Sequence, residues 1–164
     1  MTTESNRYAI ELLKADHEKV KAAFKQFKTL ESKDFALKKE LIEEICSDLK
    51  KHAMEEFFYP AIQQGSEEAR DLIFIALDEH ANAKDLIEQL HQMSPKENEF
   101  DRTVLQLSEL IELHVDQEEH EIFPLAEAVD LALIGKHIAE RKIDLEVEQF
   151  RAYHHKKKSS FAKT

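Results

Sequence analysis

A motif of histidine, glutamate, apolar residues and proline occurs twice in the chain. Residues 51–60 read KHAMEEFFYP and residues 112–124 read ELHVDQEEHEIFP. In each copy a glutamate follows the histidine by four residues, and a proline closes the motif. A second histidine precedes each copy, in DHEKV and in EHANA, so the repeat extends well beyond the motif itself. The chain is therefore a tandem duplication, which restricts it to folds with two similar halves.

The spacing of the histidines indicates the size of the repeated unit. His17 and His80 are 63 residues apart, and His52 and His114 are 62 residues apart. Within each unit the two histidines lie in separate segments whose apolar residues recur every three or four positions. That period is typical of one face of an α-helix. Each unit is thus predicted to be a helical hairpin.

The composition and the breaks between segments agree with this interpretation. Only two glycines and three prolines occur, whereas 35% of the residues are charged, and such a composition favours long helices. Breaks fall near 31–34, 64–66 and 93–98, and linkers this short favour antiparallel neighbours. We predict an all-α fold, an up-down-up-down antiparallel four-helix bundle with an additional C-terminal helix.

We expect a single domain over residues 1–153 of the 164. Its core bundle is expected at about 8–128 and the extra helix at about 131–153. Residues 154–164 read HHKKKSSFAKT, which we expect to be a basic, disordered tail.

Charge and hydropathy exclude several classes of protein. The net charge of −11 disfavours binding to nucleic acid or to an anionic membrane. The longest apolar run, residues 72–77, is too short to cross a bilayer, and MTTESNRY lacks the apolar segment of a signal peptide. We therefore expect a cytoplasmic protein without nucleic-acid or membrane partners, and a homo-oligomer is left open.

The helical period places polar residues inside the predicted bundle. Residues four apart on a helix differ by about 40° and share a face, so each His-x-x-x-Glu pair points into one region. Six buried polar groups without partners would each cost roughly 1–3 kcal/mol, a cost that a pair of bound cations would remove. Imidazole and carboxylate ligands without a thiolate suit iron, manganese or zinc. The six candidate ligands are His17, His52, Glu56, His80, His114 and Glu118.

A competing interpretation treats these histidines as ordinary core residues. A single histidine in an apolar stripe is more often a hydrogen-bonded core residue than a metal ligand. Four histidines at matching depth, duplicated together with two glutamates, are hard to explain in that way. The metal interpretation is therefore preferred.

The pattern resembles the hemerythrin-like HHE cation-binding family over about residues 8–128. The motifs that carry the resemblance are the DH of the first helix, HxxxE before YP, and HVxxEE before FP. The resemblance implies a four-helix bundle around two iron ions joined by an oxo or hydroxo bridge. It implies that His17, His52, His80 and His114 are terminal ligands and that Glu56 and Glu118 are bridging carboxylates.

The sequence departs from oxygen-carrying hemerythrins at two places. Their fifth histidine, four residues after the one in the third helix, is replaced here by Lys84. One more coordination position is then open, to water, Glu55 or Tyr59. Oxygen carriers also place the last carboxylate five residues after histidine, where this chain has Glu119. A straight helix favours Glu118, whereas a π-bulge would favour Glu119.

The resemblance indicates a protein that binds or senses dioxygen, nitric oxide or peroxide. Two alternatives remain open at this point. One is an enzyme-like role in peroxide breakdown, iron donation or iron–sulfur cluster repair. The other is non-enzymatic iron buffering.

Overall fold

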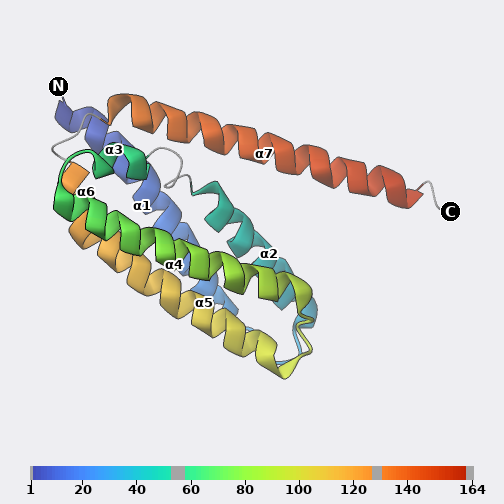
Figure 1. Cartoon of the computed structure of the whole chain (residues 1–164). Coiled ribbons are helices and arrows are strands. Elements are labelled where there is room, and N and C mark those ends of the chain that lie inside the picture. The colour runs from blue at the N-terminus through green and yellow to red at the C-terminus, as the bar shows by residue number, and fades with distance from the viewer. Residues whose placement is uncertain (1, 53–57, 127–130, 162–164) are drawn as a thin grey trace.

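The chain forms a bundle of four long helices with a fifth long helix lying across one side (Figure 1). The structure is a computed structural model that describes residues 2–52, 58–126 and 131–161, and these residues contain no strand. The predicted all-α bundle is confirmed. The bundle helices are α1 (Thr2–Phe27), α2 (Phe35–Lys51), α4 (Glu67–Gln92) and α5 (Asn98–Gln117).

Short helical segments follow α2 and α5 at the same end of the bundle. They are α3 (Tyr59–Gln63), the π-helix η2 (Glu118–Ile122) and α6 (Phe123–Leu125). Pro60 and Pro124 lie in the first turn of α3 and α6, where proline is tolerated because the first backbone N–H groups have no helical partner. The duplicated apolar-proline motif therefore starts a short helix in each half.

The breaks predicted near 31–34 and 93–98 separate long helices, and the break predicted at 64–66 lies between the short α3 and α4. The linker between α3 and α4 shows how the sequence starts a helix, because the side chain of Ser66 accepts a hydrogen bond from Ala69 N at 3.0 Å. Glu67 and Glu68 follow in the first turn of α4, where negative charge stabilises the N-terminus.

The core consists of two apolar clusters separated by a polar layer. On α1, Leu13 belongs to one cluster and Val20 to the other, with buried His17 between them. On α4, Ala76 and Ala83 lie on either side of His80 in the same way. The helical period of the sequence thus places the histidines of separate helices at one level.

The fifth long helix, α7 (Ala132–Phe161), packs mainly against α1 (Figure 1). Gly135 permits a close approach there, because a Cβ atom at this position would lie 3.1 Å from Cδ1 of Tyr8. The helix does not end at Tyr153, as expected from the sequence, but continues to Phe161. No glycine or proline follows Gly135, and a run of lysines near a helix C-terminus favours its extension.

None of the helices in the described part of the chain is both long and apolar enough to cross a membrane.

Two leucines on α5 test the assigned core. Leu107 is fully buried, whereas Leu105 is 46% exposed. Replacing Leu107 with alanine should lower the free energy of unfolding by about 2–5 kcal/mol, because it leaves a cavity in the core. Leu105→Ala should change it by about 0.5 kcal/mol or less. Urea unfolding of both variants measures the difference, and equal effects would contradict the assigned orientation of α5.

Candidate metal centre

Four imidazoles converge in the polar layer as two pairs. Nε2 of His17 lies 3.2 Å from Nε2 of His52, and Nε2 of His80 lies 2.8 Å from Nε2 of His114. Two ring nitrogens at such distances can share only one proton. Nitrogens directed at one another in this way are typical of side chains that bind a common ion.

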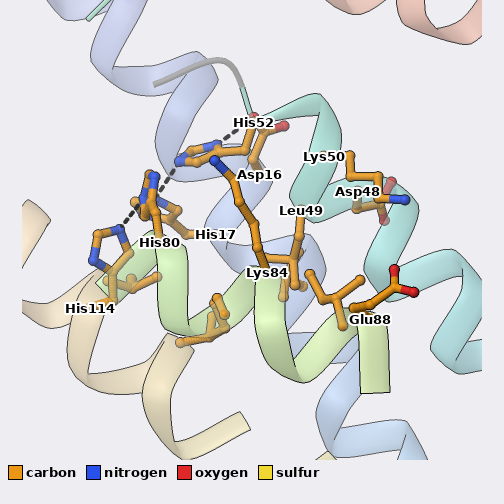
Figure 2. A pocket seen from close by; sticks show the side chains of 15 residues that line it. Asp16, His17, Asp48, Leu49, Lys50, His52, His80, Lys84, Glu88 and His114 are labelled. Carbon is orange, nitrogen blue, oxygen red and sulfur yellow. Dashed lines mark hydrogen bonds and ion pairs between the residues drawn. The ribbon is translucent and has the colours of Figure 1, made fainter. Parts of the chain in front are cut away.

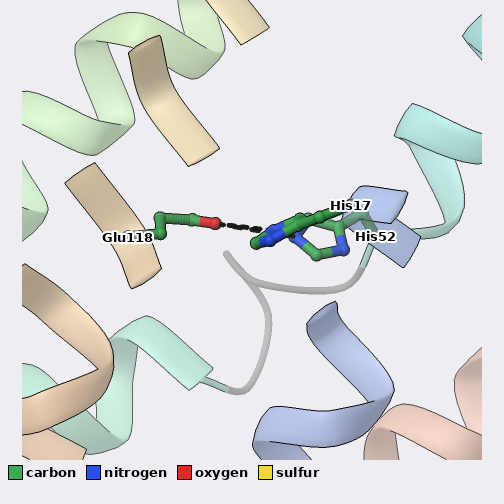
Figure 3. Close-up of side chains that lie close together, drawn as sticks. All are labelled: His17, His52 and Glu118. Atoms are coloured by element: carbon green, nitrogen blue, oxygen red, sulfur yellow. Dashed lines mark hydrogen bonds and ion pairs between the residues drawn. The ribbon is translucent and has the colours of Figure 1, made fainter. Parts of the chain in front are cut away.

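Glu118 lies between the two histidine pairs and is fully buried. Its Oε2 atom is 3.0 Å from Nε2 of His17 and 3.8 Å from Nε2 of His52. Its Oε1 atom is 2.9 Å from Nε2 of His114. Figure 3 shows the carboxylate directed at His17 beside His52. Each carboxylate oxygen therefore faces a different pair of imidazoles.

The sequence left open a straight helix, which favours Glu118, and a π-bulge, which favours Glu119. The structure has features of both. Residues up to Gln117 are α-helical, so Glu118 keeps the four-residue spacing from His114 that places both on one face. The π-helix begins at Glu118 itself. Glu119 contacts the outer nitrogen of His17, Nδ1, at 2.8 Å. The π-helix is present, but Glu118 is the carboxylate between the histidine pairs.

Carboxylates contact the Nδ1 atoms of three of the imidazoles, on the side of each ring away from the centre. Besides the Glu119 contact, Oδ2 of Asp16 lies 3.0 Å from Nδ1 of His52, and Oε2 of Glu79 lies 2.6 Å from Nδ1 of His114. In a neutral imidazole, an Nδ1–H group that donates to a carboxylate leaves Nε2 unprotonated and fixes the direction of its lone pair. These contacts therefore orient the Nε2 atoms toward the centre.

Sequence reasoning missed Asp16 and Glu79, although the repeat contained a signal for both. Each is the acidic residue directly before a candidate histidine, in DH and in EH. Each contacts the histidine of the other helix in its own half, as in Asp16 with His52. The duplication thus includes the supporting carboxylate, which a comparison of the two halves could have found.

The residue before each motif proline differs between the halves. The Tyr59 hydroxyl donates a short hydrogen bond to Oε1 of Glu118. It also lies 3.3 Å from Nε2 of His80 and 3.4 Å from Nε2 of His114. The corresponding residue in the second half, Phe123, stacks on the ring of His17 with centroids 5.9 Å apart. Only the pair His80 and His114 thus gains a phenolic oxygen from this position.

The electrostatics of the cluster fit a bound cation. Burial opposes ionisation of Glu118, but hydrogen bonds from His114, His17 and His52 hold its pKa well below the usual range. Burial also opposes the charged form of His52, yet Asp16 and Glu118 raise its pKa to about 9. The carboxylates thus favour positive charge at the centre. Oε2 of Glu118 is buried and lies 3.0 Å from Nε2 of His17, so it can contact an ion that His17 holds.

A cavity of about 440 Å³ adjoins the four histidines between α2 and α4 (Figure 2). Apolar residues form much of its wall, among them Val20, Ile87 and Ile111. Lys84 also lines the cavity and extends toward His52 in Figure 2. Lys50 and Glu88 are exposed and line the part of the cavity that is farther from the histidines. A small molecule in this cavity would reach the imidazoles beside Lys84.

Five of the six candidate ligands come together in the structure. Glu56 and the neighbouring Glu55 lie outside the described residues. The five others form two groups that could each hold a metal ion, with ligand atoms that all lie within 4.8 Å of one another. The groups are His17, His52 and Glu118, and His80, His114 and Glu118.

Cys46 lies within the apolar cluster formed by α1, α2, α4 and α5, and it is 1% exposed. Burial raises the pKa of its thiol to about 11. The thiol is therefore neutral at physiological pH, in agreement with a role in core packing.

Comparisons with known proteins agree with this geometry. The sequence model of the hemerythrin HHE cation binding domain matches residues 8–126. The fold resembles the crystal structure of a hemerythrin HHE cation binding domain-containing protein from Mycobacterium kansasii, with a TM-score of 0.72. The sequences are 22% identical, and the match covers 86% of this chain and 88% of the other.

A curated protein described as a DNA nickase, from a Nostoc species, is also similar to this chain. The two are 32% identical over 117 residues. The match covers 69% of this chain and 32% of the nickase, so the chain spans about a third of the length of that relative.

Cys46 offers a test of the packing around α2. The native protein should not react with a thiol reagent at neutral pH, because the thiol is both buried and protonated. One thiol per chain should react at once in denaturant. Absorbance after addition of a chromogenic disulfide measures both states, and rapid reaction of the native protein would show that α2 is packed differently.

Proposed function

Because this chain belongs to the hemerythrin HHE cation binding domain family, we propose that it is a non-haem di-iron protein that binds or senses dioxygen, nitric oxide or peroxide. The observation that carries this proposal is the position of Glu118, whose two carboxylate oxygens face different pairs of imidazoles. A carboxylate placed in this way can serve two cations at once. Neutral imidazoles and carboxylates are common ligands of iron.

The proposed ligand set follows the two groups of side chains. His17 and His52 hold one ion, His80 and His114 hold the second, and Glu118 contacts both. Glu56 is proposed as the second shared carboxylate, because it follows His52 by four residues as Glu118 follows His114. Bound iron would supply a change of oxidation state and open positions for a small ligand.

We propose that the small ligand binds on the side of His17 and His52. The phenolic oxygen of Tyr59 lies near the other pair, whereas His17 is covered by the ring of Phe123. The cavity reaches His52 beside Lys84. The Lys84 ammonium group can donate hydrogen bonds to an anionic or partly charged ligand there.

Peroxide breakdown is the second candidate function, and Lys84 is the observation that favours it. A lysine in place of a fifth histidine leaves a position that an exogenous oxygen ligand can take. The supporting carboxylates Asp16, Glu79 and Glu119 would keep the imidazoles in place during such a reaction.

The nickase activity of the Nostoc relative is not extended to this chain. The net charge of −11 disfavours contact with a nucleic-acid backbone. The absence of a nucleic-acid partner and a cytoplasmic location remain predictions.

The shared role of Glu118 can be tested against its neighbours. Glu118→Gln should abolish tight binding of both ions, because the same carboxylate serves both. Glu119→Gln should weaken binding by about 10- to 100-fold, as expected for a residue that orients a ligand. Glu121→Gln, an exposed position on η2, should have no effect. The measurement is iron per chain after gel filtration, across a range of free iron concentrations.

One outcome would overturn the assignment of the shared carboxylate. If Glu119→Gln lost all iron while Glu118→Gln kept two ions, the carboxylate between the ions would be Glu119.

Lys84 provides a test of reactivity. The reduced, iron-loaded protein should oxidise promptly in air without a reversible dioxygen complex, because a coordination position is open beside Lys84. Lys84→His should slow this oxidation by supplying the missing imidazole. Glu88→His, one turn farther along α4, is the matched control and should behave as the wild type. Stopped-flow absorbance follows the oxidation, and repeated reversible binding of dioxygen by the wild type would contradict the prediction.

A further inference from the structure

The cavity beside the four histidines is larger than a diatomic ligand or hydrogen peroxide requires. Its volume of about 440 Å³ falls within the range of about 300–1,000 Å³ that is usual for pockets that bind organic molecules. Dioxygen, nitric oxide and hydrogen peroxide are each close in size to roughly one or two water molecules, and a water molecule occupies about 30 Å³ in the liquid. Any of these ligands would therefore fill only a small part of the cavity.

The cavity extends along the bundle from the polar layer into the apolar cluster formed by α1, α2, α4 and α5. On α1, Val20 follows His17 by three residues. On α4, Ala83 and Ile87 follow His80 by three and by seven residues. With a rise of about 1.5 Å per residue, Ile87 lies about 10 Å along α4 from His80. The buried apolar residues that line this part of the cavity are Val20, Ala83, Ile87, Ile111 and Val115.

The two ends of the cavity differ from its walls. Figure 2 shows the histidines at one end, Lys84 in the middle, and the exposed side chains of Lys50 and Glu88 at the other end. The apolar walls between the ends offer no hydrogen bond to water, so an apolar group that replaces water there is stabilised. An occupant that matches the whole cavity has a polar group at the histidines and an apolar body along the walls.

We propose that the peroxide taken by this site is an organic hydroperoxide, R–O–O–H, whose apolar R group lies in the cavity. This inference rests on the proposed function, because it requires the two ions. The peroxide group lies at the histidine end beside Lys84, and the R group contacts Val20, Ala83 and Ile87. Each methylene group of R that the cavity buries should strengthen binding about fourfold.

The reaction is a two-electron reduction. The O–O bond breaks, and R–O–O–H with two protons and two electrons gives the alcohol R–O–H and one water molecule. The protons come from solvent. The electrons come from two ferrous ions, each of which is oxidised to ferric.

The first test is binding of the alcohol product, which reports on the cavity without any reaction. Isothermal calorimetry of the full chain, iron-loaded and oxidised, should show one binding site for cumyl alcohol. Among primary alcohols from butanol to hexanol, affinity should rise about fourfold for each methylene group.

Two substitutions in the cavity should weaken this binding. Ala83→Leu should weaken it by about tenfold or more, because the added carbon atoms occupy the space of the ligand. Ile87→Phe narrows the cavity one turn farther along α4 and should act in the same direction. Ala22→Leu is the matched control, since Ala22 is exposed on α1 and does not line the cavity. The control should bind the alcohols as the wild type does.

The second test compares two peroxides of different size. The reduced, iron-loaded protein is mixed without oxygen with cumene hydroperoxide or with hydrogen peroxide, and stopped-flow absorbance follows oxidation of the iron. Ala83→Leu should lower the ratio of the rate constant for cumene hydroperoxide to that for hydrogen peroxide by about tenfold or more. Ala22→Leu should keep the ratio of the wild type.

This inference and the proposed function fail in different ways. If the wild type bound none of the alcohols, or if Ala83→Leu and Ile87→Phe left both the affinity and the ratio unchanged, the inference would be wrong. The reaction with hydrogen peroxide would then still support the proposed function. A protein that took up no iron would overturn the proposed function, and this inference with it.

Discussion

The arrangement of the bundle depends on one fully buried carboxylate. Removing a charged carboxylate from water costs several kcal/mol unless it is paired, and Glu118 is paired with the imidazoles of His17, His52 and His114. His17 and His114 approach its two oxygens from opposite sides, at 3.0 and 2.9 Å. Each helix must therefore present its histidine at one level. The two apolar clusters on either side of the layer set that level.

The carboxylates that contact the Nδ1 atoms of the histidines also link the polar layer to the outside of the bundle. Asp16 contacts both His52 and Lys142, so this side chain of α1 connects α7 to the centre. Burial opposes the charged form of Asp16, but His52 and Lys142 keep its pKa low. The order of contacts from Lys142 to Asp16 to His52 explains why the additional helix lies along α1. Each half has an acidic residue that contacts a histidine of its other helix, Asp16 in one half and Glu79 in the other. Tyr59 and Phe123, in contrast, make the two halves chemically different.

The sequence was sufficient for features that depend on period and repetition. Helical spacing and the duplication predicted the all-α bundle, the breaks between helices and the common level of the histidines. Contacts between helices were missed. The DH and EH of the two halves marked Asp16 and Glu79 as equivalent, but the spacing along one helix does not report that Asp16 contacts His52 or that Glu79 contacts His114. The predicted end of the last helix, at about residue 153, was too early, since α7 continues to Phe161. The basic composition suggested a tail, but the segment contains no glycine or proline to end the helix. The choice between Glu118 and Glu119 required the start of the π-helix, and Glu56 lies outside the described residues.

We propose that the polar layer binds two cations, and a metal titration tests this most directly. Metal-free protein would be titrated with ferrous iron in the absence of oxygen, while bound iron per chain and the melting temperature are measured. We predict that binding ends at two ions per chain and that the melting temperature rises, because ions that bind only the folded state stabilise it. A titration that ends at no ion or one ion per chain, with no change in melting temperature, would contradict the account.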